Sequence, residues 1–244
     1  MAATAIGKDS LSGDEFLGAL EEIRKDFLGG KAFRERKRGQ TKEQIADGKR
    51  RRHLGGDGNH RFNGERYLNC DNKEVRRGQL RTLVDEGGQT SVGGDIPGHP
   101  RLEKWNSIEF GLTDEEITEL EKLDAPPDSL IVSGWWYWLH RTAPWQVTIG
   151  SALVGEGEKR LPEVKERYLR EMDETREEYE ALGLKDIGRA MALMIEHAPT
   201  GVDAEHSEFA ADIAREHLST PELQEKMRKA FILNLHGRGS PVRF

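Results

Sequence analysis

The stretch Trp135-Trp-Tyr-Trp-Leu-His-Arg-Thr-Ala-Pro-Trp-Gln146 decides the fold, because it holds four of the five tryptophans of this 244-residue chain. At 3.6 residues per turn, its apolar side chains cover more than one face of a helix, and the pattern extends over residues 130–154. A helix that is apolar on most sides is typical of the centre of a helical bundle. We therefore expect a buried central aromatic helix here, with the tryptophan rings in the core.

Further helices are indicated along the chain by capping signals and by apolar residues at helical spacing. Ser12–Glu15 and Thr41–Gln44 have the capping-box pattern, and Thr113–Glu116 repeats its spacing. No alternating period-two run predicts a strand, so the chain is expected to be all-α. Outside the aromatic stretch, helices are expected at 12–28, 41–54, weakly from 62, and at 72–85, 113–125, 162–182, 187–197, 202–218 and 221–235, with a long glycine-rich loop at 87–100.

Composition and charge exclude several classes of function. The net charge of -7 argues against general nucleic-acid binding. His140 and Arg141, in the middle of the aromatic stretch, argue against a membrane-spanning helix. The first dozen residues lack the apolar core of a signal peptide, and the single cysteine, Cys70, fits a reducing compartment and a buried apolar position. We expect a cytoplasmic protein with a tail at 1–12, one helical domain at 13–236 and a second tail at 237–244.

Two clusters of side chains are candidates for chemistry. Residues 31–52 contain ten Lys or Arg side chains against three acidic ones, and this positive field suits a small carboxylate or an acidic peptide. A solvated basic face is the alternative interpretation. Asp203 and His206 lie three residues apart on one expected helix, a spacing used by metal-carboxylate bundles, although two ligands do not make a di-iron site. Helix packing through an ion pair is the alternative for this motif. Tyr168 and Tyr179 fall on the inner stripe of the helix expected at 162–182.

Four segments, taken together, resemble the pyrroloquinoline-quinone synthase family. They are Asn69–Arg77, Gly111–Ile117, Arg141–Gln146 and Asp203–His206, in this order and at compatible spacings, and the resemblance runs from about residue 30 to 235. That family belongs to the heme-oxygenase-like helical superfamily, together with thiaminase II. The resemblance implies a bundle of about seven helices, usually a homodimer, that closes over a positive cavity and oxidises its substrate with molecular oxygen, without a metal or organic cofactor.

The resemblance also implies where the site residues lie. Arg52 matches the position of an arginine that holds the substrate in the family. Trp136 stands where the family has a tyrosine in the pocket, and Asn234 stands where it has a C-terminal lysine. Glu86 stands where the family has a histidine. Because several family histidines are missing, synthesis of pyrroloquinoline quinone itself is not expected. We expect instead an oxygen-dependent oxidoreductase that acts, in a biosynthetic pathway, on a small amino-acid-derived or peptide-derived carboxylate.

The site residues follow from the residue chemistry and the resemblance together. Beside apolar walls, Glu86 is expected to have a raised pKa and to act as a base. The expected catalytic residues are Glu86, His140 and His206. The expected substrate-binding residues are Arg52, Trp136, Tyr137, Arg141 and Asn234.

Two alternatives remain open from the sequence. The same superfamily includes non-heme di-iron oxidases, and an iron site in this chain would draw on Glu86, Glu156, Asp203 and His206. The other alternative is a catalytically silent binding or accessory protein that keeps the pocket and the dimer. Ligand binding without oxygen consumption would favour that second alternative.

Overall fold

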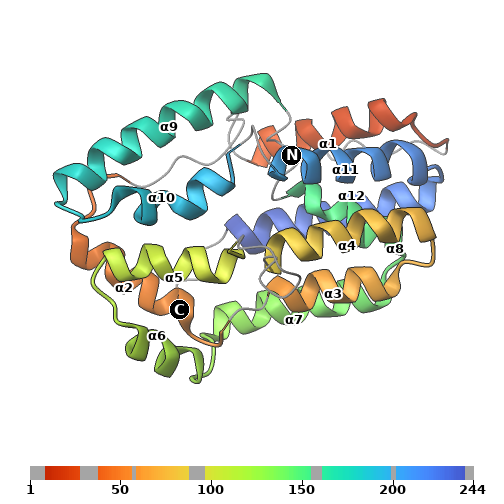
Figure 1. The fold of residues 1–244 in the computed structure, drawn as a ribbon. Helices are drawn as coiled ribbons and strands as arrows, with labels where there is room; N and C mark the ends of the chain where they lie inside the picture. Colours follow the sequence, from red (N-terminus) through yellow and green to blue (C-terminus); the bar gives the residue numbers. More distant parts are fainter. Residues whose placement is uncertain are drawn as a thin grey trace.

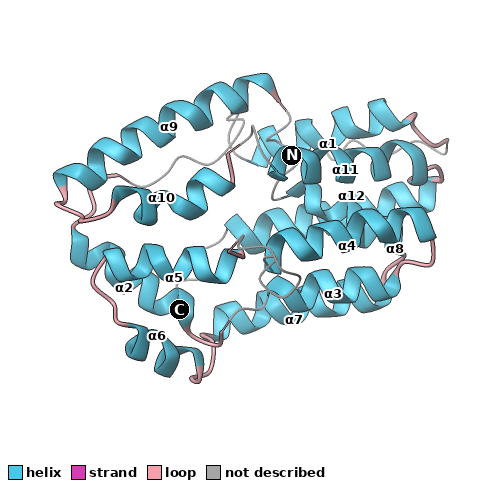
Figure 2. Cartoon of the chain, viewed as in Figure 1, coloured by secondary structure: helices cyan, strands magenta, loops and turns pink. Residues whose placement is uncertain are grey.

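The chain is built from helices, as a computed structural model shows over residues 9–27, 38–56, 59–87, 97–154, 161–198 and 202–239 (Figures 1 and 2). The described residues contain no β-strand, so the all-α prediction is confirmed. The α-helices are α1 (Gly13–Phe27), α2 (Lys42–His53), α3 (Asn59–Asn69), α4 (Lys73–Gly87), α5 (His99–Glu109), α6 (Asp114–Glu121), α7 (Pro127–Thr142), α8 (Trp145–Gly150), α9 (Pro162–Ala181), α10 (Ile187–Glu196), α11 (Val202–His217) and α12 (Pro221–Gly239).

The predicted capping signals form as hydrogen bonds. The backbone N–H of Ser12 donates to Glu15 Oε2 at 2.9 Å, and Glu15 N donates back to Ser12 Oγ at 3.4 Å. Thr41 and Gln44 form the same reciprocal box at the start of α2, and Thr113 caps α6. These bonds satisfy N–H groups that a helix start leaves without intrahelical partners.

The helices form two groups, which we call the large half and the small half (Figure 1). The large half consists of α1, α3, α4, α7, α8, α11 and α12, and its core includes Phe16, Leu20, Leu139 and Phe231. The small half consists of α2, α5, α6, α9 and α10, and its core includes Phe110, Ile117 and Met191. Helices α4 and α5 contact each other across the boundary between the halves.

The tryptophan stretch does not form one buried helix, so that part of the fold prediction is wrong. Helix α7 ends at Thr142, and α8 begins at Trp145, followed by a short 3₁₀-helix, η2 (Ser151–Val154). Pro144 explains the break, because proline disfavours helical geometry in the residue before it, and Ala143 is extended with ψ of 157°.

Helix α7 is amphipathic rather than apolar on all sides. Trp136 and Leu139 are buried, whereas Trp138 is 57% exposed and Ile131 is 63% exposed. The buried part of the stretch continues in α8, where Val147 and Ile149 are almost fully enclosed. Cys70 is buried among apolar side chains, as expected.

Helix α5 was not predicted. The sequence pattern indicated a loop at 87–100 and the next helix at 113, whereas α5 begins at His99. Gly98 precedes it and Pro100 occupies its first turn, where proline is well tolerated. Within the described ranges, none of the helices combines the length and the apolar character needed to cross a bilayer.

Candidate functional site

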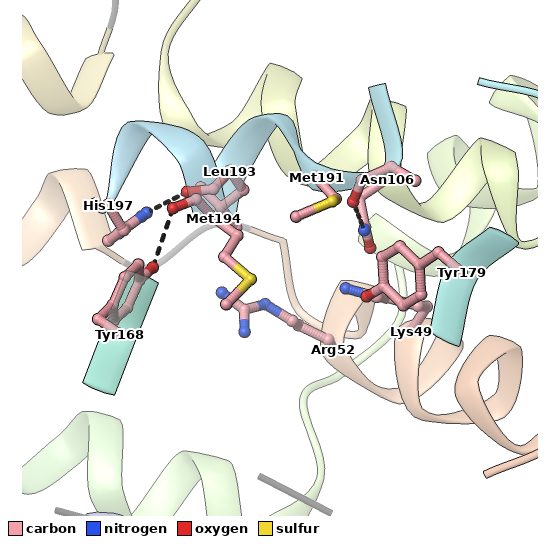
Figure 3. A pocket seen from close by; sticks show the side chains of 10 residues that line it. Lys49, Arg52, Asn106, Tyr168, Tyr179, Met191, Leu193, Met194 and His197 are labelled. Carbon is pink, nitrogen blue, oxygen red and sulfur yellow. Dashed lines mark hydrogen bonds between the residues drawn. The ribbon is translucent and has the colours of Figure 1, made fainter. Parts of the chain in front are cut away.

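A cavity of about 330 Å³ opens in the small half, between α2, α5, α9 and α10 (Figure 3). Its walls combine aromatic, thioether and aliphatic groups with a few polar groups, a composition typical of small-molecule sites. The lining residues are Lys49, Arg52, Asn106, Tyr168, Tyr179, Ala190, Met191, Leu193, Met194 and His197.

Two cations of α2 reach one carboxylate of α5 at this cavity. Lys49 and Arg52 lie three residues apart, so they share a face of the helix. Lys49 Nζ lies 2.9 Å and Arg52 Nε 3.3 Å from Glu103 Oε1. Burial raises the pKa of the Glu103 carboxyl, but the charges of Lys49 and Arg52 outweigh it, and the net pKa is lowered. Two positively charged side chains therefore lie within 3.3 Å of one carboxylate oxygen at the cavity.

The neighbouring arginine of α2 has a different environment. Arg50 Nε donates to Glu116 of α6 at 2.7 Å, and Arg50 Nη1 donates to Asp47 at 2.8 Å. Its guanidinium is thus held by two acidic side chains outside the cavity. In contrast, the guanidinium of Arg52 lies in the middle of the lining side chains (Figure 3).

The opposite wall is organised around the C-terminal turn of α10. The Tyr168 hydroxyl donates to the carbonyl of Met194 at 2.9 Å, and His197 Nδ1 donates to the carbonyl of Leu193 at 2.7 Å (Figure 3). Asn106 of α5 donates its amide to the carbonyl of Ala190. Side chains from α5 and α9 therefore hold two carbonyls of α10, that of Ala190 and that of Met194, which lies in the last turn of the helix.

A group of ionisable side chains lies next to His197, in which Glu86 and His206 are buried and His99 is partly buried. The rings of His197 and His99 are 4.4 Å apart between centroids and inclined by 34°. His99 Nδ1 lies 2.7 Å from Glu86 Oε2 of α4. Burial raises the pKa of Glu86, but the hydrogen bond from His99 and the positive charges of His99, His197 and His206 outweigh it. The net pKa of Glu86 is lowered, so the expected raised pKa is wrong, because histidines rather than apolar walls surround this carboxyl.

The three expected catalytic residues do not form one site. Glu86 and His206 are both buried and lie within electrostatic range of each other. His140 lies on α7 in the large half, where its Nε2 accepts a hydrogen bond from Arg66 Nε at 3.0 Å. Burial and the charge of Arg66 lower the pKa of His140 to about 2, so its imidazole is neutral at ordinary pH.

Of the five expected substrate-binding residues, Arg52 lines the cavity. Trp136 packs against the His140 ring, with centroids 5.0 Å apart, and Tyr137 is half-buried on the same helix. Arg141 is exposed and lies 3.8 Å from Glu65, because it projects from the outer face of α7. Asn234 is buried in α12 and accepts a hydrogen bond from Trp135 Nε1 at 2.9 Å. These four residues belong to α7 and α12 of the large half and are not among the residues that line the cavity.

The ligand set of the di-iron alternative is only partly described. Glu156 and the side chain of Asp203 lie outside the described residues. Within the part of the chain that the structure describes, no three His, Cys, Asp or Glu side chains are grouped as a metal site would require.

Most of the cavity residues were missed from the sequence. Asn106 in the cavity wall belongs to α5, the helix that was not predicted, and so do Glu103 and His99, which contact the lining residues. Tyr168 and Tyr179 did carry a signal, because they lie on the predicted inner stripe of α9. Lys49 belongs to the basic segment 31–52 that the sequence analysis singled out, whereas the place of His197 in the cavity wall follows from the tertiary packing.

Comparison with known proteins gives no relative from which to assign a function. No protein-family model matches the sequence, and no curated protein matches it. The resemblance to the pyrroloquinoline-quinone synthase family therefore stays a prediction.

Proposed function

We propose that this protein binds a small carboxylate-bearing metabolite in the cavity of the small half and oxidises it with molecular oxygen. The observation that carries the proposal is the pair of cations, Lys49 and Arg52, that share Glu103 at the cavity. An arriving carboxylate would meet these two cationic side chains in the cavity wall. The oxygen-dependent reaction is supported by the sequence resemblance.

The chemistry of the lining groups suits an amino-acid-sized acid. The planar guanidinium of Arg52 can donate two parallel hydrogen bonds to a carboxylate, and Lys49 can add a point charge. The rings of Tyr168 and Tyr179 offer flat apolar surface for the rest of the molecule. A volume of about 330 Å³ is at the small end of the range for ligand pockets.

In the proposed reaction, two electrons and two protons leave the substrate and convert O₂ to H₂O₂. The enzyme binds the acid, orients it and accepts a proton during the reaction. This balance requires one H₂O₂ for each substrate molecule oxidised.

The first experiment is a thermal-shift screen with L-tyrosine, L-glutamate and 2-oxoglutarate, followed by oxygen-electrode measurements on any acid that binds. We expect at least one of these acids to raise the melting temperature, because a ligand that binds only the folded state stabilises it. The methyl ester of the same acid should bind more weakly, which makes it the matched control.

The outcomes separate the alternatives. Oxygen uptake with equimolar H₂O₂ supports the oxidase. Stabilisation without oxygen uptake contradicts the oxidase and favours a silent binding protein. If none of the acids stabilises the protein at millimolar concentration, the carboxylate site itself is wrong.

A further inference from the structure

We propose that the cavity of the small half selects an acid that also carries an ammonium group, and that Asn106 and Glu103 form the ammonium subsite. The favoured ligand is then an α-amino acid in its zwitterionic form rather than a simple carboxylic acid. This inference rests on the proposed function for the carboxylate end of the ligand. Neither residue was among those expected from the sequence to bind a substrate.

The amide of Asn106 has a bonded end and an unbonded end. A backbone carbonyl can only accept, so the bond to Ala190 O assigns the amide nitrogen to that side and leaves Oδ1 on the other. Within the described residues, this oxygen is buried and has no hydrogen-bond partner. Asn106 and Ala190 both line the cavity, and Figure 3 shows the amide at the same end of it as Lys49 and Tyr179. The unsatisfied acceptor therefore belongs to the cavity wall.

Glu103 places a negative charge one turn away on the same helix. Residues three apart share a helix face, with Cβ atoms about 5–6 Å apart. Its Oε1 contacts Lys49 and Arg52, whereas its Oε2 is buried and has no hydrogen-bond partner in the part of the chain that the structure describes. The lowered pKa of this carboxyl keeps it anionic at neutral pH. Helix α5 therefore carries a neutral and a charged acceptor side by side at the cavity.

These two acceptors favour an amine in the ligand. A buried acceptor without a donor is unfavourable, because folding has removed the water that bonded it in the unfolded chain. A ligand N–H group restores such a bond, and an ammonium is the strongest donor for the purpose because it also pairs with the charge of Glu103. The carboxylate of a simple acid brings no donor, so it leaves Asn106 Oδ1 unsatisfied.

Arg52 supplies the opposite charge close to the two acceptors. Its side chain retains 60% exposure, so a ligand can reach it, and its Nε lies 3.3 Å from Glu103 Oε1. In an α-amino acid the ammonium and the carboxylate are attached to the same carbon, so the groups that hold them must be close neighbours. The cation of α2 and the acceptors of α5 meet this requirement, and a zwitterion can pair with both.

The first test compares ligands that differ only in the amine. Calorimetry on the complete protein should compare L-tyrosine with desaminotyrosine, and L-glutamate with glutarate. In at least one pair we expect the amino acid to bind about tenfold more tightly, because the acid without the amine leaves buried polar groups unpaired. Equal affinities within both pairs, or no binding by any of the four acids, overturn the proposal.

The second test removes the charge of the subsite and keeps its shape. Glu103→Gln should weaken binding of the amino acid about tenfold, because the ammonium loses its ionic partner. The acid without the amine should bind at least as tightly as before, because Arg52 no longer shares its charge with Glu103. Equal weakening of both acids would mean that Glu103 only positions the cations, and it would overturn the subsite.

The matched control is Glu116→Gln. Glu116 is also a glutamate that contacts an arginine of α2, but that arginine is Arg50, which lies outside the cavity. We expect this variant to change the affinity of neither acid. An effect equal to that of Glu103→Gln would show a general effect of charge and would contradict the subsite.

The third test removes the neutral acceptor. Asn106→Leu has a similar volume but lacks Oδ1, so the preference for the amino acid should fall while the acid without the amine keeps its affinity. A folded Asn106→Leu with an unchanged preference overturns the role of Asn106. Because the variant also loses the bond to Ala190, circular dichroism must show that it folds, and if it does not, Glu103→Gln decides the proposal.

The subsite and the proposed function fail separately. If an amino acid binds in preference to its counterpart but no oxygen is consumed, the oxidase fails and the subsite stands. If acids without an amine bind as tightly as amino acids, the carboxylate site stands and the ammonium subsite fails.

Discussion

The large half and the small half are both helical, yet they use their side chains differently. In the large half, Phe16, Phe231 and Met227 are fully enclosed, and the tryptophan stretch packs against that core. In the small half, the core around Phe110 and Met191 leaves a cavity with cations and a histidine in its wall. The tryptophan stretch therefore contributes to the core of the large half, whereas polar residues from separate parts of the sequence form the candidate site in the small half.

The largest expected effect separates an enclosed ring from an exposed one in the large half. Phe231→Ala should lower the free energy of unfolding by about 3–5 kcal/mol, because it leaves a cavity in the core. Trp138→Ala should cost less than about 1 kcal/mol, because the indole is 57% exposed. Chemical denaturation measures both. Equal losses would mean that the Trp138 face of α7 is buried, which would contradict the exposed position of its indole.

Two glycines of α1 test how closely helices approach in the large half. A Cβ at Gly13 would lie 2.4 Å from the Cα of Arg215, so Gly13→Ala must displace backbone and should cost about 1–3 kcal/mol. Gly18 is exposed, and there is open space where its Cβ would lie. Gly18→Ala should therefore raise the free energy of unfolding by about 0.5–1 kcal/mol, because alanine has the higher helix propensity. Melting temperatures that move in the same direction would contradict the α1–α11 packing.

Glu86 links the two halves and makes stability depend on pH. Its pKa is lowered from 4.5 in the folded chain, so its contribution is fully present above that value and is lost as pH falls through the folded pKa. Glu86→Gln should lower the free energy of unfolding by about 1–3 kcal/mol at pH 7, because it removes the anionic partner of the partly buried His99. The difference in unfolding free energy between Glu86→Gln and the wild type should become smaller below about pH 4. Urea unfolding at pH 7 and at pH 3.5 measures this difference in free energy. An equal difference at both pH values would contradict a lowered pKa of Glu86.

The sequence predicted local structure better than the site. The caps at Ser12, Thr41 and Thr113 are local signals, and their helices start where they indicate. Pro144 was a visible breaker, but the apolar run around it suggested one continuous helix. The periodicity could not show which face of α7 is open to solvent, because that depends on how the helices pack.

The site could be predicted only in part. Arg52 was inferred from the family resemblance and lines the cavity, as does Lys49 of the predicted basic segment 31–52. Its partner Glu103 lies on α5, a helix with little apolar periodicity, and therefore gave no signal. His197 and His99 are about a hundred residues apart in sequence and meet only through the tertiary fold.

The most direct test of the central claim, that the cavity of the small half holds a carboxylate, compares two neighbouring arginines. Calorimetry should measure the binding of the acid that best stabilises the wild type among L-tyrosine, L-glutamate and 2-oxoglutarate. We predict that Arg52→Lys weakens binding about tenfold, because lysine cannot form the paired hydrogen bonds, and that Arg50→Lys leaves affinity unchanged. Equal losses from both variants, removed by moderate salt, would show a diffuse surface field instead of a site and would contradict the account.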